Sequence, residues 1–256
     1  MVFTSDNNEL HYEMSGTGEI PVLLLHGWGG STESWLPVWR DLGEYRRLIN
    51  IDFPGFGQSP EPSDAWGVGD YADFLLAFLD GLGETRIDVI AHSFGGRVAL
   101  VMNQKRPDLI RKQVLTGAAG LRKPPESGAV KTPRGMKGLY DNALTHQLLG
   151  DKAIEKIRNF VRSRFGSEDY KNATPRMREV FQKVVNEDLS YCLDGIRAST
   201  LLLWGRNDTA TPLWMGQEME RRIPDAALVI FENAGHFAYL EQYQRFIAII
   251  KNFLVG

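Results

Sequence analysis

The sequence predicts an α/β protein in which helices cover both faces of a mostly parallel sheet. Short apolar runs alternate with amphipathic helical segments along most of the chain, which is typical of parallel strands joined by helices. A polar, helix-like stretch between about residues 121 and 191 interrupts this alternation. With 256 residues, 43% of them hydrophobic, the chain is long enough to bury one sizeable core.

The first half of the chain supplies most of the predicted sheet. Residues 10–15 alternate in polarity, and together with residues 2–4 they predict a leading hairpin. Short segments built around two or more consecutive apolar residues then predict strands at residues 21–25, 47–51, 87–91 and 112–116, the first two of them buried. Apolar positions at helical spacing predict the intervening helices at residues 34–42, 68–82 and 94–104. Gly83 and Pro107 follow the last two helices, as expected for residues that end a helix.

The second half resumes the same alternation after the helix-like stretch. Strands are expected at residues 200–204 and 227–231, and helices at 213–223 and 242–254. A helical insert of this kind is most simply a lid over the carboxyl ends of the strands, where open α/β sheets bind ligands. We therefore expect a core of residues 1–120 and 192–256, with a helical cap at residues 121–191.

The composition of the expected cap differs from that of the core. Residues 121–190 hold 14 Lys and Arg against 9 Asp and Glu, while the rest of the chain has a net charge of −8. This distribution either draws anionic substrates toward the cap or is simply a solvated face of it. Apolar side chains recur in it at helical spacing, and they either face the pocket or pack on the core: Phe160, Val161, Phe165, Val180, Phe181, Val184 and Val185.

Charge and cysteine content bear on the partners and the compartment of the protein. The net charge of −3 gives no overall attraction to nucleic acid or to anionic membranes. The single cysteine, Cys192, rules out an internal disulfide framework and is interpreted as structural. No apolar run approaches the ~18 residues of a membrane span, and the first 15 residues lack the apolar core of a signal peptide. We therefore expect a cytosolic location, and the oligomeric state stays open.

Metal and cofactor motifs are not apparent. The histidines show no ligand spacing such as H-E-x-x-H: His11, His26, His92, His146 and His236. One rival pattern is a dinucleotide-binding unit, in which residues 27–29 open a turn and Asp52 ends the next strand. The third glycine of that fingerprint is missing, because Thr32 stands in its place. We expect no metal and no cofactor.

Ser93 has the sequence context of a catalytic nucleophile. Residues 87–96 (IDVIAHSFGG) predict a strand, a one-residue turn and a helix, with Ser93 at the turn. In a nucleophile elbow this turn is strained, so the hydroxyl stands clear at the top of the sheet. The positions two before and two after the serine must be small, and Ala91 and Gly95 meet that need. Ala91 replaces the usual glycine, and an ordinary helix-capping serine is the alternative.

A glycine-rich turn supplies a candidate oxyanion hole. Residues 26–30 (HGWGG) directly follow the strand at 21–25. Acyl transfer places negative charge on the substrate's carbonyl oxygen, and backbone N–H groups must already point at it. We assign this role to the N–H groups of Trp28 and Phe94. His26 is interpreted as bracing the turn rather than as a base.

An acid and a base follow the last two predicted strands. Asp208 lies after the strand at 200–204, and His236 lies after the strand at 227–231. Taken singly, each is more often a turn residue, but Ser93, Asp208 and His236 all follow parallel strands and should meet at one sheet edge. Neutral His236 can then accept the Ser93 proton, while Asp208 holds the imidazole tautomer. Asp52 and Asp88 are poorer candidates, since they lie in a turn and at the wrong end of a strand.

The order and spacing of five segments make the chain resemble the α/β-hydrolase family along essentially its whole length. They are HGWGG with DFPGFGQS, then AHSFGG, GRNDTATP and AGHFAYLEQ. The resemblance implies an eight-stranded sheet, a cap domain, and the roles given above to Ser93, Asp208, His236, Trp28 and Phe94. A serine at the elbow argues against similarity to the haloalkane dehalogenases and epoxide hydrolases, which use aspartate, and to the dienelactone hydrolases, which use cysteine.

The reaction expected first is hydrolysis of a carboxylic ester, with thioester, lactone and amide cleavage as alternatives. Carbon–carbon bond hydrolases of aromatic degradation also use Ser, His and Asp under a helical cap. In those enzymes Trp commonly follows the catalytic histidine, where this chain has Phe237, and the glycine loop is more extended. A non-catalytic small-molecule receptor would be expected to lose a member of the triad or oxyanion hole, and this chain keeps them all.

Overall fold

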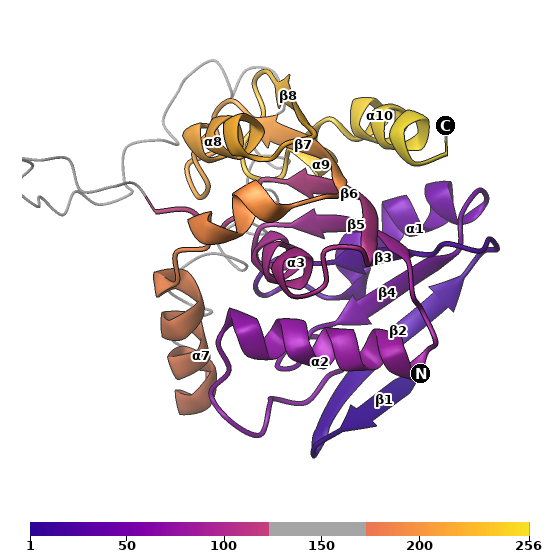
Figure 1. Cartoon of the computed structure of the whole chain (residues 1–256), viewed down its shortest axis with the longest axis vertical. Helices are drawn as coiled ribbons and strands as arrows, with labels where there is room; N and C mark the ends of the chain where they lie inside the picture. Colours follow the sequence, from indigo (N-terminus) through magenta and orange to yellow (C-terminus); the bar gives the residue numbers. More distant parts are fainter. Residues whose placement is uncertain (123–172, 256) are drawn as a thin grey trace, which may run out of the picture. The chain divides into compact units, whose positions relative to one another are not determined.

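A computed structural model of the chain describes residues 1–122 and 173–255. Within these residues, eight strands form one sheet in the order β1-β2-β4-β3-β5-β6-β7-β8 (Figure 1). This confirms the predicted fold class. The strands are β1 (Val2–Ser5), β2 (Asn8–Ser15), β3 (Val22–Leu25), β4 (Leu48–Asp52), β5 (Ile87–His92), β6 (Ile110–Thr116), β7 (Ser199–Gly205) and β8 (Ala226–Phe231).

The sheet is antiparallel only at its first edge. β1 pairs with β2, and β2 with β4, in antiparallel register, whereas every later neighbour pair from β4 to β8 is parallel. The residues of β3, β4 and β5 are all buried. Because side chains alternate between the two faces of a strand, complete burial means that both faces of the sheet are covered.

Helices alternate with the strands as the sequence predicts. α2 packs against α3 on the sheet face toward the viewer in Figure 1, and α1 packs against α10. In the described residues the helices are η1 (Thr32–Trp35), α1 (Leu36–Gly43), α2 (Val68–Gly81), α3 (Phe94–Lys105), α7 (Pro175–Asn186), η2 (Ser190–Gly195), α8 (Trp214–Arg222), α9 (Ala238–Glu241) and α10 (Tyr243–Val255). None of these helices is long and apolar enough to span a bilayer.

The helix expected at residues 34–42 differs in detail from its prediction. It is divided into the 3-10 turn η1 and the helix α1. Pro37 occupies the first turn of α1, where its missing N–H costs no helical hydrogen bond. The same proline cannot sit in a helix interior, so a continuous helix through this region is disfavoured.

The expected cap falls mostly outside the described residues, which exclude residues 123–172. The remainder of the chain clusters as one compact unit, Met1–Leu121 with Thr174–Gly256. α7 belongs to this unit and is tied to the loop before α2. Arg176 donates to the carbonyl oxygen of Pro62 (3.0 Å), and Lys183 donates to that of Ala65 (2.7 Å). The cap range of 121–191 stays a prediction.

Candidate active site

Ser93 connects the end of β5 to the start of α3 in a strained conformation. Its φ and ψ are 49° and −105°. Among the described residues, every other non-glycine residue with positive φ is Asp or Asn, which tolerate that region better. A backbone of this kind costs about 1–3 kcal/mol and persists only where its surroundings impose it.

Hydrogen bonds from β6, from the loop after it and from the first turn of α3 hold the Ser93 backbone. Its N–H donates to the carbonyl oxygen of Thr116 (3.2 Å), and its own carbonyl oxygen accepts from Gly96 and Ala119 (both 3.1 Å). The bonds to Thr116 and Ala119 thus hold the strained turn through residues distant in the sequence. This is the geometry predicted for a nucleophile elbow.

Gly95 explains why a small residue is needed two positions after the serine. Its N–H donates to the carbonyl oxygen of His26 (3.1 Å), and a Cβ at this position would overlap the carbonyl oxygen of Leu25. α3 therefore begins directly against the end of β3. The contact places the start of α3 beside the glycine loop that follows β3.

Asp208 and His236 form a buried pair in the loops after β7 and β8. His236 Nδ1 lies 2.8 Å from Asp208 Oδ2, and the two side chains are only 8% and 0% exposed. Asp208 Oδ1 accepts the N–H groups of Ala210 and Thr211 (both 2.9 Å). With an ionised carboxylate as its partner, Nδ1 carries the proton, so Nε2 is the basic nitrogen of the imidazole.

Thr211 is a member of this group that the sequence analysis missed. Its hydroxyl lies 2.8 Å from Asp208 Oδ2, 3.1 Å from His236 Nδ1 and 3.0 Å from the Gly117 carbonyl oxygen. It thus links the acid, the base and the loop after β6. The only sequence signal is its position three residues after Asp208, which is common in turns of many kinds.

His92 connects the Ser93 turn with the His236 loop. Its Nε2 lies 3.0 Å from the carbonyl oxygen of His236, and the two imidazole ring centroids are 4.7 Å apart. Gly117 lies beside the acid–base pair, where a Cβ would be 3.2 Å from Asp208 Oδ2 and 3.3 Å from His236 Nδ1. The loops after β5, β6, β7 and β8 therefore meet at one edge of the sheet.

The glycine loop after β3 lies against the same turn. A Cβ at Gly27 would be 2.8 Å from His92 Nδ1 and 3.4 Å from Ser93 Cβ, so a side chain has no room there. Trp28 follows, and its ring is 5.5 Å from that of Phe94. Phe94 is the first residue of α3, where the backbone N–H has no acceptor within the helix. Trp28 and Phe94, the two candidate oxyanion residues, thus lie next to each other at the Ser93 turn.

His26 braces the glycine loop, as the sequence analysis interpreted it. Its Nε2 accepts the N–H of Phe53 (3.0 Å), which places the ring proton on Nδ1, and Nδ1 lies 2.7 Å from the Gly27 carbonyl oxygen. Both ring nitrogens are therefore used within the fold. His26 is fully buried.

Comparison with known proteins identifies the family. The sequence profile described as the alpha/beta hydrolase fold matches residues 20–243. The chain belongs to the α/β-hydrolase family. This α/β hydrolase is 30% identical to 2-hydroxy-6-oxo-2,4-heptadienoate hydrolase of Pseudomonas putida over 249 residues, which cover 92% of this chain and 89% of that protein.

Solved structures agree with this assignment at the level of the fold. An α/β-hydrolase enzyme from a Medee basin deep-sea metagenome library matches 100% of this chain and 98% of its own, with a TM-score of 0.81 at 19% identity. The enol-lactonase of Burkholderia xenovorans matches with a TM-score of 0.78 at 21% identity, over 100% of both chains. These matches confirm the α/β-hydrolase fold.

Within the described part of this α/β hydrolase, no group of three or more His, Cys, Asp or Glu side chains is placed to hold a metal ion. Of the apolar residues that recur at helical spacing in the expected cap, Phe160, Val161 and Phe165 lie outside the described residues. The others lie on α7, where Val180 and Val184 are buried and Val185 is exposed. Phe181 contacts the Trp28 ring at a centroid distance of 5.0 Å.

Proposed function

We propose that this protein is a serine hydrolase that cleaves a carboxylic ester of a small molecule through an acyl-enzyme on Ser93. The observation that supports it is the convergence of a strained serine and a buried Asp–His pair at one sheet edge. Each of the three residues follows a different parallel strand.

The first half of the reaction transfers the acyl group to Ser93. The Ser93 hydroxyl oxygen adds to the ester carbonyl carbon, and its proton passes to Nε2 of His236. Asp208 stabilises the resulting imidazolium, while the N–H groups of Trp28 and Phe94 hold the oxyanion. Collapse of this tetrahedral intermediate breaks the bond to the alcohol oxygen, which takes the proton from His236.

The second half returns the free enzyme. A water molecule gives its proton to His236 and adds to the acyl carbon. The second tetrahedral intermediate then expels the Ser93 oxygen, which recovers the proton. The products are one carboxylic acid and one alcohol, and no cofactor enters the balance.

Hydrolysis of a carbon–carbon bond is the second candidate. It is favoured by the 30% identity to 2-hydroxy-6-oxo-2,4-heptadienoate hydrolase over nine tenths of both chains. That substrate is a ketone with a conjugated leaving group, so the same triad would act on it, with proton delivery to carbon instead of oxygen. The carbon–carbon bond hydrolases commonly have Trp after the catalytic histidine and a more extended glycine loop. Phe237 and the short glycine loop of this chain depart from that pattern.

The discriminating experiment compares two substrate types on wild type and Ser93→Ala. We expect hydrolysis of p-nitrophenyl esters of short or medium acyl length, with kcat lowered by several orders of magnitude in Ser93→Ala. A kcat/KM for the heptadienoate far above that of every ester would establish the second candidate. A Ser93→Ala enzyme that kept more than about a tenth of the activity would refute Ser93 as nucleophile.

Labelling with a fluorophosphonate tests the alternative that the protein is a non-catalytic receptor. An activated Ser93 reacts covalently with this probe, whereas a small-molecule receptor on the same fold would not. We expect labelling of wild type and none of Ser93→Ala. The cytosolic location expected from the sequence stays part of this proposal.

A further inference from the structure

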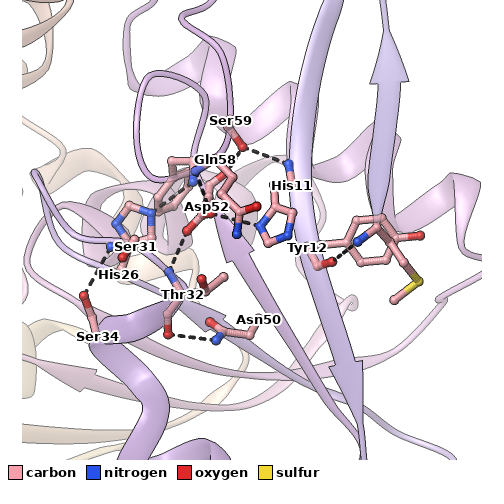
Figure 2. Close-up of polar contacts among 12 residues, drawn as sticks. His11, Tyr12, His26, Ser31, Thr32, Ser34, Asn50, Asp52, Gln58 and Ser59 are labelled. Carbon is pink, nitrogen blue, oxygen red and sulfur yellow. Dashed lines mark hydrogen bonds and ion pairs between the residues drawn. The ribbon is translucent and has the colours of Figure 1, made fainter.

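A second buried carboxylate lies outside the proposed triad, at the end of β4. Asp52 is fully buried and faces His11, its direct cross-strand partner on β2. Its Oδ2 lies 2.9 Å from His11 Nδ1 (Figure 2). Three strands of the sheet (β3, β5 and β6) lie between β4 and β7, and β7 is the strand that precedes Asp208. Asp52 is therefore not an alternative triad acid.

Two backbone N–H groups complete the surroundings of this carboxylate. Oδ1 accepts from Thr32 (2.6 Å), and Oδ2 accepts from Gln58 (2.9 Å) as well as from His11. We call His11, Thr32, Asp52 and Gln58 the Asp52 cluster (Figure 2). Each oxygen is thus engaged by donors from segments that are far apart in the sequence.

The Asp52 cluster fixes the far end of the glycine loop, because Thr32 is where that loop enters η1. The Thr32 carbonyl oxygen is also held, by the side-chain amide of Asn50 (3.0 Å). The near end of the loop is held by His26, whose Nε2 accepts the N–H of Phe53 (3.0 Å). Both ends of the loop are therefore attached to one short stretch at the end of β4.

The carboxylate is enclosed by the chain that follows it. Gly57 has a φ of +56°, and a Cβ there would overlap the Asp52 carboxyl group. The Ser59 hydroxyl donates to the Asp52 carbonyl oxygen (2.6 Å), and accepts the N–H of His11 (2.8 Å). An enclosed group of this kind acts on its protein neighbours and not on substrate.

We propose that Asp52 is a positioning residue that sets the place of the Trp28 N–H in the oxyanion hole. This inference rests on the proposed function. Trp28 lies between the two attachments of the loop, and an oxyanion donor is effective only when it is held in place before charge develops. Loss of the Thr32 attachment would let the loop relax away from Ser93.

The test uses two variants of graded severity, measured with a p-nitrophenyl ester. Asp52→Ala removes both acceptor oxygens, and we expect kcat to fall roughly tenfold to a hundredfold, somewhat less than the loss of a whole oxyanion donor. Asp52→Asn keeps one acceptor and should fall between Asp52→Ala and wild type. KM should stay within about twofold, since the ester's ground state carries no oxyanion.

An inhibitor separates positioning from general loss of structure. An aryl trifluoromethyl ketone adds to Ser93 as a charged hemiketal, so its affinity should fall in parallel with kcat. Titration of active sites with a fluorophosphonate corrects kcat for any inactive protein. If Asp52→Ala does not fold, Asp52→Asn carries the same test.

Asp88 provides the matched control. It is also fully buried, but at the amino end of β5, where its oxygens bind Arg46 (2.6 Å) and Arg111 (2.9 and 2.6 Å). Asp88→Ala, or Asp88→Asn if that variant does not fold, should lose stability and keep kcat per active site. Unchanged kcat and inhibitor affinity in both Asp52 variants, or an equal fall in the Asp88 control, would overturn the inference. Retained activity in Ser93→Ala would instead overturn the proposed function.

Discussion

At the scale of single residues, the surroundings of Asp208 leave no freedom in how its side chain is oriented. Two backbone N–H groups, from Ala210 and Thr211, fix Oδ1, and Oδ2 faces His236. An asparagine here must keep its oxygen toward the two N–H groups. Its amide N–H would then point at His236 Nδ1, which could only accept, and the proton would move to Nε2.

Asp208→Asn should therefore lower kcat by about 10⁴-fold, because an Nε2–H tautomer cannot take the Ser93 proton. The measurement is kcat for a p-nitrophenyl ester, with Asp194→Asn as the control. Asp194 is an exposed carboxylate paired with Arg222, and its replacement should leave turnover unchanged. Near-normal turnover in Asp208→Asn would show that a group other than Asp208 orients the His236 imidazole.

Cys192 carries a pH prediction of its own. Burial raises the pKa of the Cys192 thiol to about 11, and this residue of η2 is buried in the interior. A raised thiol pKa means that the reactive thiolate is scarce until the pH approaches that value. Reaction with a disulfide reagent should thus be slow at pH 8 and accelerate about tenfold per pH unit below the pKa. Equal rates for native and urea-unfolded protein at pH 8 would contradict it.

The proposed triad could be read from the sequence because each member directly follows an apolar run. Predicting Ser93, Asp208 and His236 required no knowledge of how the strands are paired in register. The Thr211 hydroxyl and the His11–Asp52 pair could not be found in this way. The pair depends on β2 lying antiparallel to β4, so that His11 stands opposite Asp52 across 41 residues of sequence.

At the scale of elements, α7 separates two interpretations of the apolar residues expected in the cap. Val180 and Val184 are buried in the described unit, which is what packing requires. Phe181 contacts the ring of Trp28, a candidate oxyanion residue. α7 thus contributes both to the core and to the surroundings of the proposed site.

Phe181→Ala should change the kcat/KM ratios among p-nitrophenyl esters of different acyl length, roughly tenfold for the best-fitting chain. Its effect on stability should be small, because Phe181 is only half-buried. Val184→Ala is the matched control, and should lower the free energy of unfolding by about 1–3 kcal/mol without changing those ratios. Unchanged acyl preference in Phe181→Ala would remove α7 from substrate selection.

The elements that the sequence did not reveal are the short ones. α9 spans four residues and η2 six, too few for a helical period to be visible. The division between η1 and α1 depends on Pro37, whose effect is local. Long amphipathic helices such as α2 and α10 were predicted to within a residue or two, because burial of one face gives their sequence a helical period.

At the scale of the whole molecule, the sheet order explains why the sequence alone could predict that the candidate site residues lie near one another. Parallel neighbours from β3 to β8 present their carboxyl ends at one edge. Any residue just past those ends must lie near the others. The order of the strands, in contrast, depends on packing between elements distant in the sequence, and the family resemblance supplied the number of strands.

The positive φ of Ser93 has a consequence for the thermal tolerance of the whole protein. Glycine adopts such a backbone without strain, whereas alanine keeps the strain and loses only the hydroxyl. Ser93→Gly should therefore unfold at a higher temperature than Ser93→Ala, by the few degrees that about 1 kcal/mol provides in a chain of this size. Calorimetry of the two inactive variants measures this difference directly. Equal unfolding temperatures would show that the turn at Ser93 is not strained. Selection for heat resistance alone would thus favour an inert protein, and the hydroxyl persists only where turnover is also selected.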